Sequence, residues 1–166
     1  MDSLALWFAE TLGQYVSGEA VIFLISMIPI LELRGGLLVA WSIGVPIMKA
    51  IPICIVGNII PIPFILLFIK KIFKWMKRFS VFKGLVGRME ERAMKKSDSI
   101  KKYEFVGLML FVGVPLPGTG AWTGSLIAAL LDVDLKKAVV AELLGIAIAT
   151  FIVSILSYGL LGSIVG

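Results

Sequence analysis

Three ionisable side chains lie within apolar stretches of this chain of 166 residues, where a charge is costly. Glu32 and Arg34 stand two residues apart in "PILELRGG", and Glu142 lies inside the last apolar stretch. A buried carboxyl can accept a proton or a cation, and an arginine can bind a phosphate through paired hydrogen bonds. Glu32 and Arg34 have a second interpretation, a structural ion pair that holds a turn. Glu142 either reaches the centre of the membrane or stays near its surface beside Lys136 and Lys137, and we favour the surface.

Other kinds of chemistry find no support in the sequence. The chain has no histidine, which excludes a histidine-based triad, a histidine zinc site and an imidazole proton relay. No nucleophile–base pair, metal cluster or phosphate-binding loop of the GxxxxGK[ST] type is visible. We therefore expect no enzyme activity, no metal and no cofactor. Cys54 is the single cysteine and cannot form an intrachain disulfide.

The composition indicates an all-α integral membrane protein. Hydrophobic residues make up 59% of the chain, whereas soluble domains contain about 45–50%. We expect several passes through the plasma membrane. Residues 1–18 carry apolar side chains near helical spacing and no lysine or arginine. They are expected to form an interfacial amphipathic helix, or else a helix packed on its neighbours.

Basic residues gather in one segment, 70–103. It holds 12 of the 16 lysines and arginines of a chain whose net charge is +5. A basic loop between two apolar halves marks the cytoplasmic side of a membrane protein. We expect this segment to be cytoplasmic and to lie as amphipathic helix on anionic lipid rather than to bind nucleic acid.

The two apolar halves align with each other when the chain is shifted by 88 residues. Residues 23–60 then match 111–148 at ten positions, in a shared order of proline, glycine, lysine and glycine. The alignment indicates two repeats, 19–69 and 104–166. The identical pairs are Phe23/Phe111, Pro29/Pro117, Gly36/Gly124, Leu38/Leu126, Ala40/Ala128, Val45/Val133, Lys49/Lys137, Ala50/Ala138, Gly57/Gly145 and Ile60/Ile148.

Each repeat is expected to hold a helical hairpin and a transmembrane helix. The hairpins are 19–45 and 104–131, and the transmembrane helices are 47–69 and 135–161. The string "PLPGTG" ends a helix rather than kinking it, and the remaining arms are too short to span a bilayer. We therefore favour re-entrant hairpins over kinked spanning helices. If segment 70–103 is cytoplasmic, the hairpins enter from opposite faces, so the repeats have inverted topology.

The motifs of the chain resemble a known family. "ELRGG" at 32–36, "GN" at 57–58 followed by "PIP" at 61–63, and "PLPGTGAWTG" at 115–124 resemble the small multidrug export family. The resemblance covers nearly the whole chain outside the charged segment and implies a transporter. The paired re-entrant layout also resembles the DedA-like proteins, which are linked to lipid and polyprenyl-phosphate movement. Those proteins have an arginine after the second-half proline, where this chain has Gly118, Thr119 and Gly120.

The candidate site lies where the two hairpin turns meet. We expect the turn residues to bind substrate, because a helix that starts there directs free N–H groups inward. Helix packing through small residues is the alternative. The substrate-binding candidates are Arg34, Glu32, Gly118, Thr119, Gly120, Trp122 and Thr123; those for proton or ion coupling are Glu32 and Glu142; those for structure or gating are Pro29, Gly36, Asn58, Pro61, Pro63, Pro115, Pro117 and Gly124.

The favoured function is transport of an amphiphile with an anionic head group, a polyprenyl phosphate or phospholipid, by alternating access between the two turns. One alternative is a proton-coupled exporter of small cationic drugs, and another is a non-transporting scaffold or channel. Two transmembrane helices and two hairpins barely enclose a site. We therefore expect membrane lipids as partners and a homo-oligomer, a dimer, that completes the shielding of the hairpins.

Overall fold

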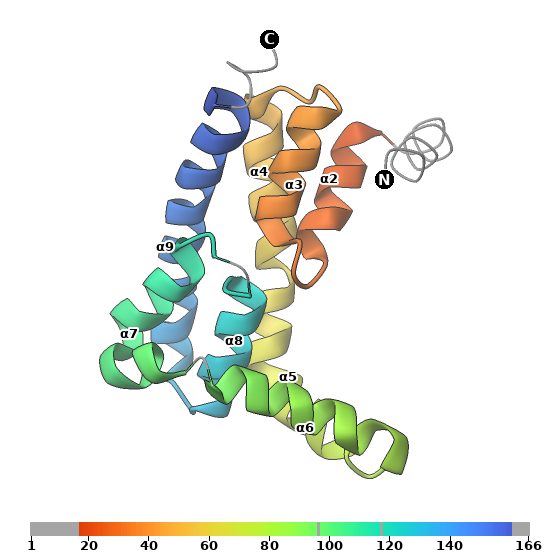
Figure 1. The fold of residues 1–166 in the computed structure, drawn as a ribbon, viewed down its shortest axis with the longest axis vertical. Coiled ribbons are helices and arrows are strands. Elements are labelled where there is room, and N and C mark those ends of the chain that lie inside the picture. Colours follow the sequence, from red (N-terminus) through yellow and green to blue (C-terminus); the bar gives the residue numbers. More distant parts are fainter. Residues whose placement is uncertain (1–16, 96, 117, 161–166) are drawn as a thin grey trace.

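The computed structural model describes residues 17–95, 97–116 and 118–160, and every regular element in those ranges is a helix (Figure 1). The prediction of an all-helical chain is confirmed for this part. The first amphipathic helix and Pro117 fall outside the described residues. The elements are α2 (Gly18–Met27), α3 (Glu32–Ser42), α4 (Ile47–Ile59), α5 (Pro61–Met76), α6 (Ser80–Lys95), α7 (Asp98–Gly113), α8 (Ala121–Leu130), α9 (Leu135–Ser154) and the π-helix η1 (Ile155–Leu160).

Two long apolar rods run side by side in opposite directions (Figure 1). One is α4 with α5, 30 residues from Ile47 to Met76, and the other is Leu135–Gly159, 25 residues. At 1.5 Å per residue they measure about 45 and 38 Å, more than the ~30 Å hydrocarbon core of a bilayer. By length and composition both can cross a membrane. The first rod continues beyond residue 69, where we expected it to end.

The two prolines of the first rod lie at a helix start. Pro61 is the first residue of α5 and Pro63 follows within its first turn, after the helical backbone of Ile60. The first N–H groups of a helix have no intrahelical partner, so proline costs little there. The chain therefore passes from α4 into α5 while the helix axis keeps nearly the same direction.

Two helical hairpins approach each other from opposite ends of the rods (Figure 1). In the first, residues 28–31 join α2 to α3, and Ile30 has a positive φ of 78°. In the second, residues 114–120 join α7 to α8. The helix α7 is interrupted at Glu104, where φ is 36° and ψ is −95°. Its apolar part is Tyr103–Gly113, so the apolar arms of both hairpins are shorter than a bilayer-spanning helix.

The same turn recurs at an offset of 88 residues. Gly44 after α3 and Asp132 after α8 both have positive φ, 75° and 56°. Both are followed by a long helix, which begins at Ile47 and at Leu135. Many helices end in a residue with positive φ, and the N–H group of the residue after it donates to a carbonyl oxygen of the last helical turn. This arrangement is a recurrent C-terminal cap. The two bonds are Val45 N–H to Ala40 O at 2.8 Å and Val133 N–H to Ala128 O at 3.0 Å.

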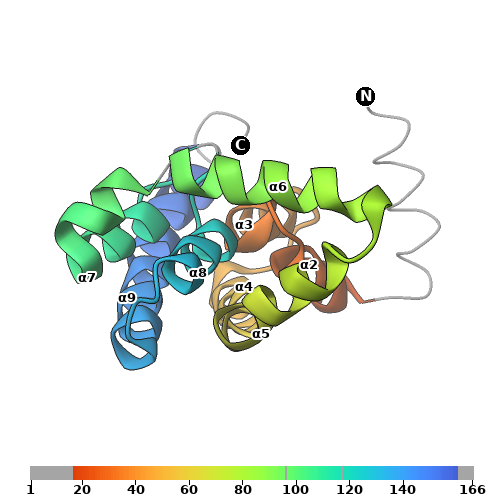
Figure 2. The same ribbon diagram turned by 90° about the horizontal axis from the view of Figure 1, so that it is seen from below.

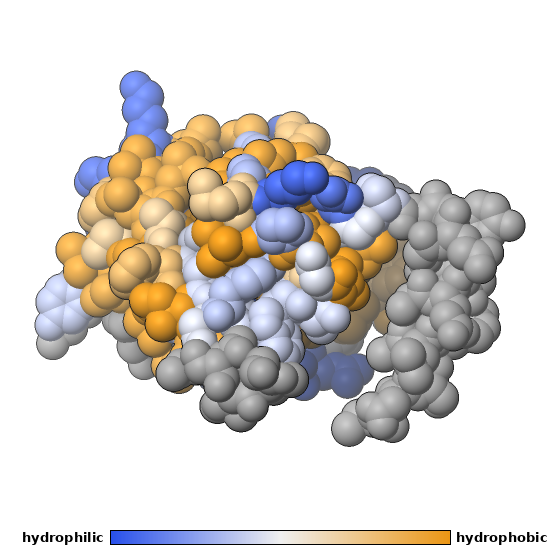
Figure 3. Space-filling view, turned by 90° about the horizontal axis from the view of Figure 1, so that it is seen from above, coloured by the Kyte–Doolittle hydropathy of each residue, from blue (hydrophilic) through white to orange (hydrophobic). Residues whose placement is uncertain are grey.

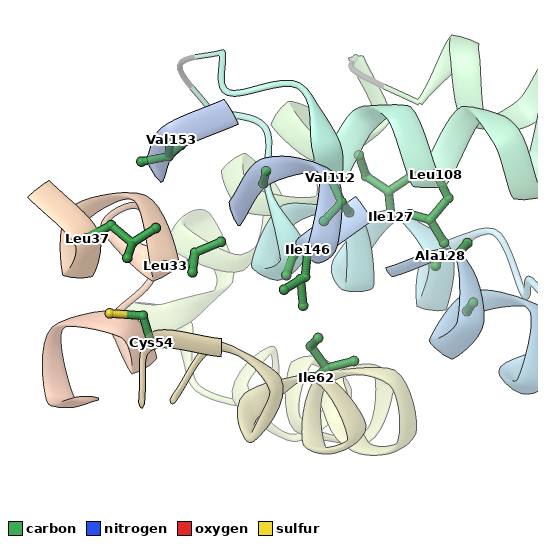
Figure 4. Packing of buried hydrophobic residues seen from close by; sticks show 14 of the residues in the cluster. Leu33, Leu37, Cys54, Ile62, Leu108, Val112, Ile127, Ala128, Ile146 and Val153 are labelled. Atoms are coloured by element: carbon green, nitrogen blue, oxygen red, sulfur yellow. The ribbon is translucent and has the colours of Figure 1, made fainter. Parts of the chain in front are cut away.

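Two glycines of the long helices also correspond at this offset. A Cβ on Gly57 would lie 2.7 Å from the carbonyl oxygen of Phe23 on α2, and one on Gly145 would lie 2.7 Å from that of Met109 on α7. Each glycine thus lets the first arm of its own hairpin pack directly on its long helix. Above and below this contact, aliphatic side chains from both halves form one buried core (Figure 4).

The outer surface of the rods is apolar. Exposed side chains include Met48 at 81%, Phe64 at 61% and Phe151 at 69%. Seen from the end that holds the α3–α4 turn, hydrophobic residues occupy much of the periphery (Figure 3). Apolar surface on this scale would be unfavourable in water and is suited to lipid.

The helix α6 lies across the other end of the bundle (Figures 1 and 2). It packs against α8 and α5, with Val86 and Ala93 buried. An ion pair between Lys77 and Glu90, with nitrogen and oxygen 2.6 Å apart, ties it to the end of α5. Segment 70–103 therefore consists of the end of α5, all of α6 and the start of α7.

Candidate functional site

The carboxylate of Glu32 caps a helix of the other half of the chain. Its two oxygens accept hydrogen bonds from the N–H groups of Ala121 at 3.1 Å and of Trp122 at 3.0 Å. These are the first residues of α8, whose N-cap, Gly120, has no side chain to offer. A negative charge at a helix N-terminus is favourable, because the free N–H groups and the helix dipole point toward it. Glu32 is 3% exposed, so this cap is buried.

Gly120 leaves the space that the Glu32 carboxylate fills. A Cβ at this position would lie 2.2 Å from Glu32 Oε2, which is far inside van der Waals contact. The φ of Gly120 is 127°, a region that other residues rarely adopt. Both the backbone conformation and the carboxylate contact therefore require glycine.

Arg34 binds the end of the helix that precedes the same turn. One guanidinium nitrogen donates to Leu116 O at 3.0 Å and to both oxygens of Thr119 at 3.1 Å. The other donates to Val112 O at 3.0 Å and Val114 O at 3.1 Å. The last carbonyls of a helix lack intrahelical partners and carry partial negative charge. Arg34 thus compensates the C-terminus of α7, as Glu32 compensates the N-terminus of α8.

We call Glu32, Arg34 and residues 112–122, to which they bind, the hairpin clasp. Within the described residues no nitrogen of Arg34 lies within 4.0 Å of a Glu32 carboxylate oxygen, and the two side chains instead hold opposite ends of the second turn. Glu32 begins α3 with a positive φ of 50°. The guanidinium nitrogens of Arg34 bond to carbonyl and hydroxyl oxygens of the second hairpin.

Other turn residues join the clasp. The indole N–H of Trp122 donates to Met27 O at 3.1 Å, which adds a further hydrogen bond between the two hairpins. The Thr119 hydroxyl lies 2.9 Å from Val114 O and 2.8 Å from Leu116 O, so it stabilises its own turn. Gly118 has a positive φ of 74°, and Thr123 is half buried on α8.

Glu142 lies inside the bundle and not at its surface. Its side chain is fully buried, and both oxygens lie within 2.9 Å of the Ser125 hydroxyl on α8. The side chain therefore faces the interior of the bundle, and the expected depth of Glu142 in the membrane stays a prediction. The neighbouring Lys137 turns outward instead, to Glu104 on α7 at 3.7 Å. Helix periodicity explains the difference, because residues five apart lie on different sides of a helix.

The two buried carboxyls are neighbours along α8. Ala121, which binds Glu32, and Ser125, which binds Glu142, are four residues apart and both are fully buried. Residues at this spacing lie on one face of a helix, one turn apart. Gly124 on α8 leaves room for α7, since a Cβ there would lie 2.8 Å from a methyl group of Val112.

The remaining candidates have structural positions. Pro29 and Pro115 lie in the two turns. Gly36 lets α2 approach α3, because a Cβ there would lie 2.1 Å from Ser26 Oγ. Asn58 is buried, and within the described part of the chain its side-chain oxygen accepts no hydrogen bond.

Two hollows indent the described part of the molecule, and the second reaches Trp122 of the clasp. A cavity of about 380 Å³ at the α8–α9 turn is lined by Ile100, Glu104, Leu131, Asp132, Val133, Asp134 and Lys137. An apolar groove of about 170 Å³ runs along α5 and includes Trp122. Neither is lined by Glu32, Arg34 or Glu142, so both hollows are separated from the clasp charges. The described residues contain no group of three or more histidine, cysteine, aspartate or glutamate side chains that could hold a metal ion.

Some contacts near the site have no simple signal in the sequence. Lys70 at the end of the first rod pairs with Asp132 in the α8–α9 turn. The hydroxyl of Tyr158, at the far end of the second rod, donates to Val45 O at 2.8 Å. Both contacts join residues of different halves and depend on how the halves pack.

The fold and the clasp define a class, a small α-helical membrane protein with ionisable groups in its interior. The family described as "Putative small multi-drug export protein" matches residues 32–152. The chain belongs to this family, so the resemblance carried by "ELRGG" and "PLPGTGAWTG" is confirmed. The matched range begins at Glu32 and contains the clasp and Glu142. Comparison with curated proteins and with solved structures found no match.

Proposed function

We propose that this chain is a proton-coupled membrane exporter in which Glu142 carries the proton. The observation that supports this proposal is a carboxyl with no exposed surface, hydrogen-bonded to a single hydroxyl, on a helix that can cross a membrane. Burying a lone carboxylate is costly, and binding a proton removes the charge. Proton exchange at Glu142 therefore needs a conformation that opens α8 from α9, and this requirement links proton movement to conformational change.

The proposed architecture is a pair of inverted repeats with re-entrant hairpins. The turn that recurs at 88 residues, the short hairpin arms and their approach from opposite ends favour it. Non-helical backbone at membrane depth is tolerated only where protein or water shields it. Inverted repeats whose broken helices meet at mid-membrane are a recurrent transporter design, and they work by rocking one part against another.

In this mechanism the hairpin clasp is the closed gate. Opening the two turns exposes two charges and two helix ends together, because Glu32 and Arg34 each bind the opposite turn. In the open state, substrate or water must therefore bind the two charges and the two helix ends. Substrate that binds near Thr119, Gly120 and Trp122 would replace contacts of the clasp rather than fill an empty cavity.

The orientation follows from charge. With segment 70–103 in the cytoplasm, the α8–α9 turn and its cavity face the cell interior, and the first hairpin enters from outside. The protein would then be a multi-pass protein of the plasma membrane. A homodimer would complete the shielding of the hairpins, and the mass of the detergent-solubilised protein tests this; a strict monomer would contradict it.

A second candidate is transport of an amphiphile with an anionic head group, a polyprenyl phosphate or a phospholipid. The N-terminus of α8 already holds a carboxylate, so an anionic head group could replace Glu32 there. The bonds of Arg34 to carbonyls make this candidate weaker than the sequence suggested, because the guanidinium would have to leave all of them.

Transport by reconstituted liposomes distinguishes the candidates. We expect a proton gradient to drive movement of an ethidium-like cation, and Glu142→Gln to abolish the effect of the gradient while keeping the Ser125 hydrogen bond. The matched control is Glu91→Gln, on the exposed face of α6, which should transport as the wild type does. If labelled polyprenyl phosphate moves and Glu142→Gln has no effect, the second candidate holds. If neither moves, the chain is a scaffold or channel.

A further inference from the structure

An exposed cluster of aromatic rings marks the corner between α5 and α6. Trp75 and Phe79 stack edge to face with ring centres 5.2 Å apart, and Phe82 lies edge to face with Phe79 at 6.5 Å. Their exposed fractions are 58%, 47% and 41%. Exposing three aromatic rings together to water is unfavourable. We therefore expect this cluster to contact an apolar or interfacial partner.

The helix α6 continues the exposed apolar surface. Val81, Leu85 and Met89 follow each other at intervals of four residues and so lie on one face. All three are exposed, Val81 by 83%. This face differs from the one that carries Val86 and Ala93, which is buried against the bundle. We call Trp75, Phe79, Phe82, Val81, Leu85 and Met89 the α5–α6 apolar surface.

Basic side chains border the α5–α6 apolar surface. Exposed lysines and arginines stand next to it on both helices: Lys74, Arg78, Arg88 and Arg92. The acidic residue Glu91 lies on a different face of α6 and is bonded to Lys95 at 2.7 Å. The hydrogen bond from Lys95 lowers the pKa of this exposed carboxyl.

We propose that the α5–α6 apolar surface docks on the surface of an anionic phospholipid bilayer. Charge complementarity favours this partner, since aromatic and aliphatic side chains bordered by lysine and arginine are the pattern of an interfacial amphipathic helix. Continuity favours it too, because α6 follows within four residues of the end of the apolar rod and lies across that end (Figures 1 and 2). The bilayer that surrounds the rod therefore meets α6 at its head groups. The proposal is independent of the exporter function.

A fluorescent label at two positions tests which face meets lipid. In the full-length protein in phosphatidylcholine vesicles with phosphatidylglycerol, a label on Val81→Cys should be quenched by spin-labelled lipid and shielded from iodide. A label on Glu91→Cys should behave in the opposite way. The wild type, whose single Cys54 is fully buried, is the labelling blank. Equal iodide quenching at both positions would overturn the proposal.

Lipid charge gives the second measurement. Arg88→Gln with Arg92→Gln should lower the preference for phosphatidylglycerol by about fivefold per charge removed. Lys49→Gln, at the opposite end of the rod, removes one positive charge and should change nothing. No effect of phosphatidylglycerol in any variant contradicts an anionic partner. A label at position 81 that neither quencher reaches, with a signal that rises with protein content, would assign the surface to a second copy of the chain.

Discussion

The Glu32 carboxylate accepts a hydrogen bond from the backbone N–H of Trp122 at 3.0 Å, although the two residues are 90 positions apart. Together with Arg34, which binds the carbonyls at the end of α7, it places opposite charges against opposite helix ends. Each charge is satisfied by backbone dipoles rather than by the other charge. The two hairpins are therefore joined at their turns by a charged contact with no solvent between its partners.

Removing the Glu32 carboxylate should destabilise the fold. Glu32→Ala leaves the N–H groups of Ala121 and Trp122 buried without an acceptor, and we expect a loss of about 2–3 kcal/mol in the free energy of unfolding. Unfolding in mixed micelles, followed by far-ultraviolet circular dichroism, measures the loss. Glu91→Ala, on an exposed carboxyl, should stay within about 0.5 kcal/mol of the wild type. Equal stability of both variants would show that the cap contributes nothing.

Arg34 should not be replaceable by lysine. Arg34→Lys keeps the charge but loses the planar fork that bonds carbonyls on both sides, so we expect a loss of about 1–3 kcal/mol. The same unfolding assay measures the effect, with exposed Arg92→Lys as the matched control. A stable Arg34→Lys protein would mean that charge alone holds the turn.

Gly120 should tolerate no side chain. In Gly120→Ala the added Cβ meets the Glu32 carboxylate at 2.2 Å, and the positive φ of 127° adds strain. We expect a loss of at least about 2 kcal/mol or failure to accumulate as folded protein. Gly84→Ala on α6 meets nothing within 4 Å and should be neutral or stabilise by up to about 1 kcal/mol. Similar yields and unfolding midpoints for the two variants would contradict this account.

The close packing of each hairpin arm on its long helix should depend on Gly57 and Gly145 alike. Gly57→Ala and Gly145→Ala each bring a methyl group to 2.7 Å from a carbonyl oxygen of the facing helix. We expect both to lower stability by about 1–3 kcal/mol, because backbone must move to make room. Gly87→Ala, with open space around it, is the control. An effect in only one half would argue against equivalent packing of the two halves.

Much of the fold follows from local patterns. The apolar content, the glycine and proline clusters and the offset of 88 residues predict an all-helical chain with turns near residues 30 and 117, and helix breaks occur at both. These features depend on neighbours in the sequence, such as a proline that ends a helix or a glycine that permits a positive φ. The family follows from the same short motifs.

The partners of the charged residues do not follow from such patterns. The sequence predicts that Glu32 and Arg34 form a substrate site or, in the alternative, a structural ion pair, and it favours the membrane surface for Glu142. Local spacing sets the direction of a side chain only relative to its own helix. What it meets depends on how the helices pack and on where their ends lie.

The sequence by itself determined the membrane class, the helices, the two turns and the family of this protein. Only the tertiary structure decided that Glu32 caps α8, that Arg34 binds the end of α7 and that Glu142 is buried against Ser125. The physical reason is that unpaired N–H and C=O groups appear wherever a helix ends. Which charge satisfies them depends on which distant segment packing brings to that end.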